Sequence, residues 1–180
     1  MSQTTLDIKE PGLNVLPPGV ERHVVNAGGL TGLQIFLDDE IEIINNEGNQ
    51  ICEIICFNKD GKSELAILNQ KENSKQSFIK EILKRKDESS LITNLQLKKR
   101  NLDIKKSKSS ILFDNKTPSG EKLKIKSKDK CYVIFSAPQN DMLVSEQNPS
   151  SDLTIFIKRS KIINDKELSI IPDPVFEPNY

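Results

Sequence analysis

Cysteine and histidine are the residues best suited to metal binding or nucleophilic chemistry, and this chain has few of them. They are Cys52, Cys56, Cys131 and His23. Cys52 and Cys56 lie in one apolar run, and on an extended strand four residues span roughly 13 Å, so one metal ion cannot bridge them. We therefore expect no metal and no cofactor, with the thiols packed as small apolar side chains. A nucleophilic pair of His23 with a cysteine stays open.

Two short segments resemble ligand-binding loops in composition only. Residues 28–32 are glycine-rich, but they lack the Gly-Lys-Ser/Thr ending of a phosphate-binding P-loop. Residues 38–40 are all acidic, but the ligand spacing of a calcium-binding EF-hand is missing. We interpret the first segment as a turn that needs a positive φ, and the second as a solvated turn before a strand.

Polar residues in and between apolar segments predict a ligand site. Gln50 and Glu53 lie within an apolar run, and a polar loop near residue 140 separates two other apolar runs. A polar side chain on a buried strand needs a partner. We expect Glu53 to turn inward and meet this loop, or alternatively to pair with Arg22. No catalytic residue is assigned, and the candidate ligand-binding residues are Gln50, Glu53, Asn140, Asp141, Gln147 and Arg22.

The charge is balanced overall but unevenly distributed. The chain has 26 Lys and Arg against 26 Asp and Glu, yet residues 71–130 hold 18 basic and 8 acidic residues. Binding to bulk nucleic acid favours a net positive charge. No aromatic residue is interleaved with the lysine runs to stack on bases, and these runs lie at 84–86, 98–100 and 105–108. We interpret them as solvated faces, with contact to phosphates or to an anionic substrate as the alternative.

Alternating apolar residues predict that most of the chain forms strands. Residues 40–44 and 50–57 flank a Gly/Asn cluster, so we predict that they pair as an antiparallel hairpin across the turn at 45–49. Short strands are also predicted at 32–37 and 64–68. Four further strands are expected nearer the C-terminus, at 110–113, 122–126, 131–135 and 153–157.

The middle of the chain has helical periodicity. Residues 74–86 place apolar side chains at helical spacing with Ser74 as N-cap, and a second short helix begins near residue 89. The fold class is therefore mainly β (α+β), an antiparallel barrel or sandwich-like sheet with one or two short helices in the middle. We expect an extended N-terminal arm, a single β-rich domain and a proline-containing C-terminal arm, at 1–18, 19–160 and 161–180.

We expect neither a targeting segment nor a membrane span. The first residues lack the apolar core of a secretory signal peptide, and no apolar run approaches the ~20 residues of a membrane helix. Hydrophobic residues make up 36% of the chain and charged residues 29%, which is typical of soluble globular proteins. We expect a cytoplasmic homo-oligomer with reduced thiols and no membrane contact.

Several short phrases of the sequence, read in order, are shared with one family. They are GVER at 19–22, EGNQICE at 47–53, FDNKTPSG at 113–120, SAP at 136–138 and NPSSDL at 148–153. In this order they resemble the urea carboxylase-associated domain family, which recurs beside or fused to aminomethyltransferase-like proteins. The most characteristic piece is a Gly-x-Gln-x-x-Asp/Glu turn, formed here by Gly48, Gln50 and Glu53.

The resemblance implies a setting in the metabolism of small amines and one-carbon units. A similar domain accompanies a folate-binding, T-protein-like domain in trimethylamine N-oxide demethylase. The resemblance therefore implies an accessory or ligand-binding domain with a small-molecule ligand and an aminomethyltransferase-like (T-protein-like) partner. Two alternatives remain open. One is a stand-alone, metal-assisted lyase or demethylase acting on a small nitrogen compound, and the other is a nucleic-acid-binding β-domain that uses the lysine-rich middle.

Overall fold

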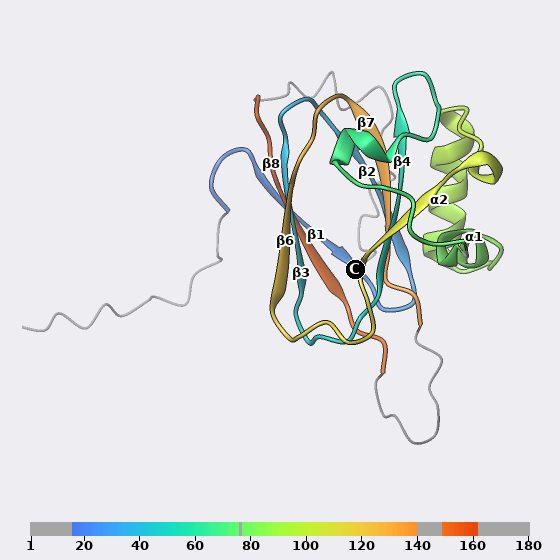
Figure 1. Cartoon of the computed structure of the whole chain (residues 1–180). Helices are drawn as coiled ribbons and strands as arrows, with labels where there is room; N and C mark the ends of the chain where they lie inside the picture. The colour runs from blue at the N-terminus through green and yellow to red at the C-terminus, as the bar shows by residue number, and fades with distance from the viewer. Residues whose placement is uncertain (1–15, 76, 140–148, 162–180) are drawn as a thin grey trace, which may run out of the picture.

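Two antiparallel sheets packed face to face form the body of the molecule (Figure 1). The computed structural model describes residues 16–75, 77–139 and 149–161. Within these ranges, sheet A has the strand order β1-β8-β3-β6 and sheet B the order β2-β7-β4-β5. The strands are β1 Val20–Val25, β2 Leu30–Ile35, β3 Glu40–Asn45, β4 Cys52–Asn58, β5 Ser109–Phe113, β6 Glu121–Lys126, β7 Cys131–Ser136 and β8 Leu153–Lys158.

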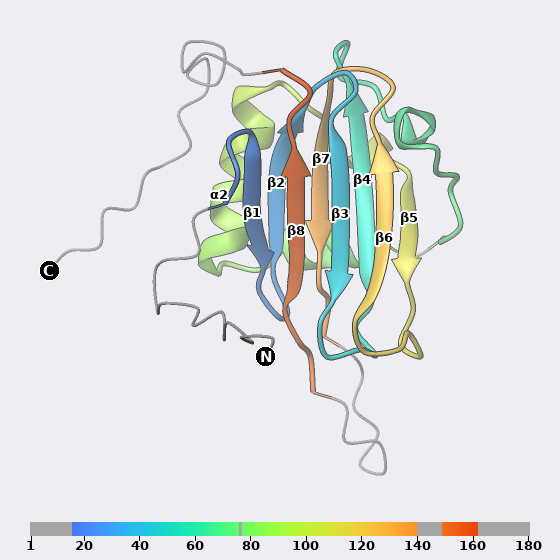
Figure 2. The same ribbon diagram turned by 90° about the vertical axis from the view of Figure 1, so that its left-hand side faces the viewer.

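The long connection from β4 to β5 contains the helices of the described residues. They are the 3-10 helices η1 Leu65–Leu68 and η2 Ile104–Lys106 and the α-helices α1 Phe78–Leu83 and α2 Glu88–Lys99. Helices α1 and α2 cover the outer face of sheet B, whereas the outer face of sheet A carries no described helix (Figure 1, Figure 2). None of these described helices is long and apolar enough to span a bilayer.

The strand pairing is nested. β1 pairs with β8, β2 with β7, β3 with β6 and β4 with β5. This nesting is the strand order of a jelly roll, in which two four-stranded sheets pack face to face. The connections β1–β2, β3–β4 and β5–β6 pass between the sheets at one end of the molecule, which we call the crossover end (Figure 2). The described stems of the β7–β8 connection, which follow β7 and precede β8, lie at the same end. The predicted mainly β, sandwich-like fold is confirmed, and the described sheets do not close into a barrel.

Aliphatic side chains fill the space between the sheets. Every strand contributes to this core, in which Ile35, Ile54 and Phe135 are fully buried. Burying a side chain of this size contributes about 1.5–3 kcal/mol. A second apolar cluster lies between sheet B and the helices α1 and α2. Sheet B is thus covered on both faces, which explains why β7 is buried along its whole length, as its continuous apolar run predicts.

The predicted hairpin between residues 40–44 and 50–57 is wrong, although both segments form strands. β3 pairs with β6 and β8 in sheet A, whereas β4 pairs with β5 and β7 in sheet B. The segment between them crosses from one sheet to the other, with positive φ at Gly48 and Asn49. Apolar alternation shows which side of a strand faces the core, but it does not identify the partner strand. A Gly/Asn turn suits a crossover as well as a hairpin.

The strand predicted at 64–68 is also wrong, because this segment forms η1. Leu65, Ile67 and Leu68 are all buried. A strand would point the adjacent Ile67 and Leu68 to opposite faces, whereas a helical turn lets both reach the core. Asn69 ends the helix in the left-handed conformation, at φ 55.

Both predicted helices form, with different boundaries. The N-cap of α1 is Ser77 rather than Ser74, and its hydroxyl accepts from the Lys80 amide at 3.3 Å. α2 has 12 residues, longer than its apolar pattern indicates. Its buried face includes the polar residues Ser90, Thr93 and Gln96, whereas Leu91 and Leu95 are exposed. Apolar periodicity therefore underestimates this helix.

The remaining predicted strands are found close to their expected places. The segment predicted at 32–37 forms β2, and the four C-terminal predictions correspond to β5, β6, β7 and β8. Most of the predicted N-terminal and C-terminal arms, at 1–18 and 161–180, lies outside the described residues.

Candidate functional site

Glu53, the predicted ligand anchor, does not turn into the space between the sheets, so that expectation is wrong. It lies fully buried on the opposite, helix-covered face of sheet B, the face of Ile55 and Phe57. Its carboxylate accepts hydrogen bonds from the Ser77 hydroxyl at 2.8 Å, the Phe78 amide at 2.7 Å and the Ile79 amide at 3.4 Å. These groups form the N-terminus of α1, where the backbone amides and the helix dipole favour a carboxylate. The alternative ion pair with Arg22 is not formed among the described residues, because Arg22 lies on β1 in the opposite sheet.

The surroundings of Glu53 also change its acidity. Burial raises the pKa of the Glu53 carboxyl, and the hydrogen bonds from Ser77, Phe78 and Ile79 oppose this shift. Both carboxylate oxygens are engaged with α1, so Glu53 anchors this helix to β4. A role of Glu53 in ligand binding stays a prediction.

Gln50 lies at the crossover end and holds both stems of the β7–β8 connection. Its side-chain amide donates to the Pro138 carbonyl at 2.8 Å, and its side-chain oxygen accepts from the Ser151 amide at 2.8 Å. Asn45 donates to the Gln50 backbone carbonyl at 2.8 Å. Gln50 and Asn45 are buried, so water competes little for these bonds. Three predicted site residues in this connection lie outside the described residues, namely Asn140, Asp141 and Gln147.

The β3–β4 and β5–β6 connections, which contain two of the shared phrases, meet at the same end. The Asn49 amide donates to the Thr117 carbonyl at 2.7 Å. Gly48 has a φ of +78°, and a Cβ on it would lie 2.6 Å from the Ser119 nitrogen. Only glycine fits this close approach of two backbones without displacement. These residues therefore join two crossovers, which gives the Gly-x-Gln turn a structural role.

The three cysteines are free and buried inside the sandwich. Burial raises the pKa of the Cys52 thiol well above its usual range. Contact with Cys131, together with burial, does the same for Cys56. Such thiols stay protonated and are weak nucleophiles and weak metal ligands. Within the described part of the chain, no group of three or more His, Cys, Asp or Glu side chains is placed to hold a metal ion.

His23 belongs to a charged network rather than to a Cys–His pair. It donates to the Glu21 carboxylate at 3.3 Å, and Arg159 donates to the same carboxylate at 2.7 Å and to Asp39 at 2.7 Å. The hydrogen bond from His23 and the interactions with Arg159 lower the pKa of Glu21, although partial burial opposes this. The network ties β1 and the end of β8 to the turn between β2 and β3.

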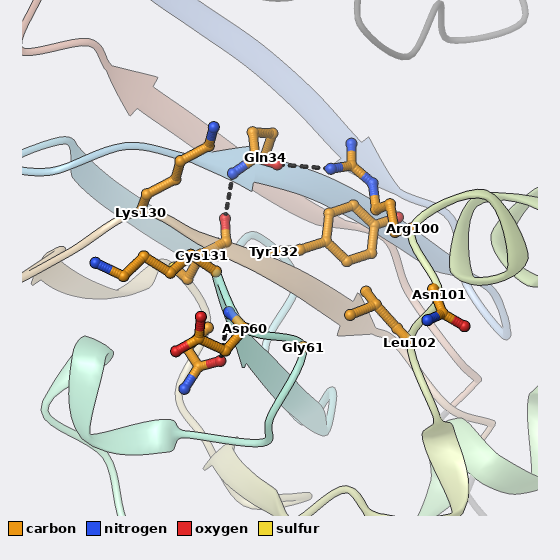
Figure 3. Close-up of a pocket in the computed structure, with 11 residues that line it drawn as sticks. Gln34, Asp60, Gly61, Arg100, Asn101, Leu102, Lys130, Cys131 and Tyr132 are labelled. Carbon is orange, nitrogen blue, oxygen red and sulfur yellow. Dashed lines mark hydrogen bonds between the residues drawn. The ribbon is translucent and has the colours of Figure 1, made fainter.

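A pocket of about 330 Å³ lies beside sheet B, between the end of α2 and the turn after β4 (Figure 3). Its lining includes three basic side chains, Lys59, Arg100 and Lys130, and one acidic side chain, Asp60. Tyr132 supplies an aromatic wall. We call this hollow the basic pocket, because its charged lining residues give it a positive potential.

Arg100 is held in the basic pocket by neighbours from sheet B. Its guanidinium lies 4.2 Å from the centre of the Tyr132 ring and donates to the Gln34 side-chain oxygen at 2.6 Å. Gln34 is itself oriented by donating to the Cys131 carbonyl at 2.9 Å. Figure 3 shows Arg100 and Lys130 on either side of Gln34, with Asp60 across the pocket. Stacking and hydrogen bonding thus orient the guanidinium before any ligand binds.

Local backbone features place these side chains. α2 ends at Lys99 with Arg100 as its C-cap, and the next residue, Asn101, turns the chain with a φ of 54°. The Tyr132 hydroxyl donates to the Gln96 side chain of α2. It passes directly over Gly32 on β2, where a Cβ would clash with the hydroxyl oxygen. The lack of a side chain at Gly32 therefore makes room for the tyrosine that supports Arg100.

The other basic side chains come from two tight turns. Lys59 follows β4 in a turn where the Asn58 side-chain oxygen accepts from the Asp60 amide at 3.0 Å. Lys130 precedes β7, and its ammonium lies 5.5 Å from the centre of the Phe36 ring. Both lysines are exposed, so they are free to adjust to a ligand at the rim of the basic pocket.

The basic pocket was not predicted from the sequence. Arg100 was interpreted with the run 98–100 as part of a solvated face. Its neighbours Gln34 and Tyr132 are far from it along the chain, and they meet it only because β2 and β7 pair and α2 packs on them. No local pattern links these residue types, so no feature of the sequence indicated the pocket.

Comparison with known proteins gives a relationship to one enzyme. No protein-family model matches the chain. Over 171 residues, or 95% of its length, the chain is 30% identical to a trimethylamine-oxide aldolase of Ruegeria pomeroyi. The chain is related to one segment of that enzyme. The match covers 22% of the aldolase, so the chain spans about a fifth of the length of the relative it matches. Membership of the urea carboxylase-associated family stays a prediction.

Proposed function

We propose that the chain is an accessory, ligand-binding domain of small-amine metabolism. The similarity to a trimethylamine-oxide aldolase supports this metabolic setting, because trimethylamine oxide is a small nitrogen compound. The match covers nearly the whole chain but only 22% of the relative. A match of this kind supports the role of a module that works within or beside a larger enzyme.

The packed interior of the jelly roll supports an accessory role for the chain. Side chains from all eight strands fill the space between the sheets, and Ile54, Phe135 and Ile155 are fully buried there. Burial raises the pKa of the Cys52 thiol in this core, and contact with a neighbouring thiol together with burial raises the pKa of Cys56, which keeps these two thiols protonated. A substrate would have to displace this core in order to react inside the sandwich. Ligands therefore bind at the surface, which favours a binding role over catalysis in the interior.

The partner that we propose is an aminomethyltransferase-like, T-protein-like protein, as the sequence resemblance implies. This partner would carry the reacting groups for one-carbon transfer, and the present chain would contribute ligand binding. We also propose that the chain forms a homo-oligomer. Size-exclusion chromatography with light scattering, on the chain alone and mixed with such a protein, measures both associations.

An exchange of segments tests the metabolic assignment. The matched segment of the Ruegeria pomeroyi enzyme is replaced by this chain, and the consumption of trimethylamine oxide is measured. We expect the chimera to keep turnover and the isolated chain to show none. A chimera that is soluble and folded by circular dichroism but inactive would overturn the assignment. Turnover by the isolated chain, with about one metal ion per chain by elemental analysis, would favour a stand-alone lyase instead.

A further inference from the structure

We propose that the basic pocket binds a small organic anion through its carboxylate or phosphate group. Three side chains from separate elements carry the proposal, namely Arg100 at the end of α2, Lys59 in the turn after β4 and Lys130 in the turn before β7. The proposal goes beyond the accessory role, because an anion can bind here whether or not the chain acts in amine metabolism.

The charges of the pocket select for an anion. Lys59, Arg100 and Lys130 all line a hollow of about 330 Å³, and Asp60 is the one acidic side chain among its described lining residues. Basic side chains gathered in a concave site repel one another and create a positive potential. An anion relieves this repulsion and is drawn in by the potential. Neutral ligands gain neither advantage.

The same charges disfavour a small amine. An aliphatic amine is a cation at neutral pH, since its pKa lies near the value of about 10 found for lysine. Among the described residues that line the basic pocket, it would meet one carboxylate, that of Asp60, and three cationic side chains. The ligand of this pocket is therefore chemically different from a protonated amine. An amine and an anion can bind the same domain at different places.

Arg100 is the residue best oriented to recognise the anionic group. A guanidinium presents several N–H donors in a planar fork that matches two oxygens of a carboxylate or phosphate. The bond to Gln34 and the stacking on Tyr132 fix the plane of this fork. A side chain that is already ordered loses less conformational entropy when the ligand binds.

The size and the wall of the pocket favour an organic anion. Its volume of about 330 Å³ lies at the lower end of the range for ligand pockets, roughly 300–1,000 Å³. The Tyr132 ring and the Leu102 side chain line the same hollow and provide apolar contact (Figure 3). The charged group can therefore face the basic residues while a short hydrocarbon part contacts the apolar wall.

Calorimetric titration of the purified full chain tests the proposal. The probes are inorganic phosphate, succinate and trimethylammonium chloride, at pH 7 and low ionic strength. We expect phosphate or succinate to bind, with a Kd on the order of 1 mM or lower, and trimethylammonium not to bind. The Kd should rise with added salt, because salt screens exposed charges. Binding of phosphate alone or of succinate alone supports the proposal and identifies the anionic group that is recognised.

Substitutions in the basic pocket give a pattern that depends on charge. We expect Lys59→Met and Lys130→Met each to raise the Kd about threefold, and Arg100→Gln to raise it about tenfold or more. Asp60→Asn should lower the Kd, because it removes the one negative charge. The matched control is Lys124→Met, on the outer face of sheet A, where the lysine side chain is 79% exposed. This control should leave the Kd unchanged.

The outcomes that overturn the proposal are equally definite. One is that neither anion binds at concentrations up to ~50 mM, which is far above the Kd expected for a specific site. Another is that trimethylammonium binds as tightly as the anions. A Kd that is indifferent to Lys59→Met, Lys130→Met and Asp60→Asn would also overturn it. The two lysines and Asp60 are exposed, so these variants are expected to fold even if Arg100→Gln does not.

Discussion

Replacing Glu53 with Gln tests whether the buried carboxylate anchors α1 to sheet B. The change keeps the size of the side chain but exchanges one acceptor oxygen for an amide group that can only donate. In the native chain, one carboxylate oxygen accepts from Ser77 at 2.8 Å and the other accepts from Phe78 at 2.7 Å. The Ser77 hydroxyl can rotate to accept from a glutamine amide, but a backbone N–H cannot. The amide of the glutamine would face either the Phe78 N–H or the Ile79 N–H, which shares an oxygen with Ser77, so one backbone donor loses its acceptor.

The expected loss follows from this one unmatched donor. A buried donor that loses its acceptor costs about 1–3 kcal/mol. For a chain of this size, each kcal/mol corresponds to about 2–4 °C in Tm. The matched control is Glu81→Gln on the same helix, where the glutamate side chain is 71% exposed and forms an ion pair with Lys84 at 3.2 Å. Exposed pairs contribute at most about 1 kcal/mol, so the control should change stability little.

The pH dependence of this loss has a definite sign. Burial raises the pKa of Glu53 above its ordinary value of 4.5, so the folded protein keeps this proton to a higher pH than the unfolded chain does. The stabilisation linked to Glu53 is complete below the unfolded pKa and declines as pH rises through the folded pKa. Urea unfolding followed by circular dichroism should therefore show a larger loss for Glu53→Gln at pH 5 than at pH 8. A variant as stable as wild type at both pH values, or a loss that grows with pH, would refute the reasoning.

Three further substitutions test other parts of the structure. Gln50→Leu leaves two buried backbone groups without partners, so the free energy of unfolding measured in urea should fall by about 2–5 kcal/mol. A fall below about 1 kcal/mol would contradict the role of Gln50 in holding the β7–β8 stems. Gly32→Ala forces the Tyr132 hydroxyl aside, and we expect a loss of about 1–3 kcal/mol with altered near-ultraviolet circular dichroism; an unchanged spectrum would argue against the close contact. The lowered pKa of Glu21 stabilises the fold above pH 4.5, and this contribution is lost as pH falls through the folded pKa. Glu21→Gln should therefore make the fall in the free energy of unfolding at acid pH less steep. An equally steep fall in the variant would show that this carboxylate does not contribute.

The individual strands of this fold could be predicted because each depends on a local pattern. Alternation of charged and apolar residues places β3 and β6, and a continuous apolar run places β7. Side chains on one strand point alternately to two faces, so in β3 and β6 the apolar alternation shows which face is turned to the core. The helix α2 could be predicted only at its start, because its buried face contains Ser90, Thr93 and Gln96. Those polar residues are buried by packing on sheet B and not by their own hydrophobicity.

The predicted candidate site was only partly located by the same reasoning. Gln50 and Glu53 were recognised as polar residues in an apolar strand region, and both are buried and hydrogen-bonded in the structure. Their partners could not be predicted, because the pairing of strands decides them. Gln50 meets the stems of the β7–β8 connection at the crossover end, whereas Glu53 meets the first turn of α1.

The sequence by itself determined a mainly β fold, an aliphatic core and the burial of the cysteines, because these properties depend on residue type and on periodicity along the chain. Tertiary structure alone decided the nested strand order, the crossing between β3 and β4, and the meeting of Gln34, Arg100 and Tyr132 in the basic pocket. The physical reason is that an apolar face can be buried against any complementary face. The choice among these partners depends on the packing of the whole chain, which no local segment contains.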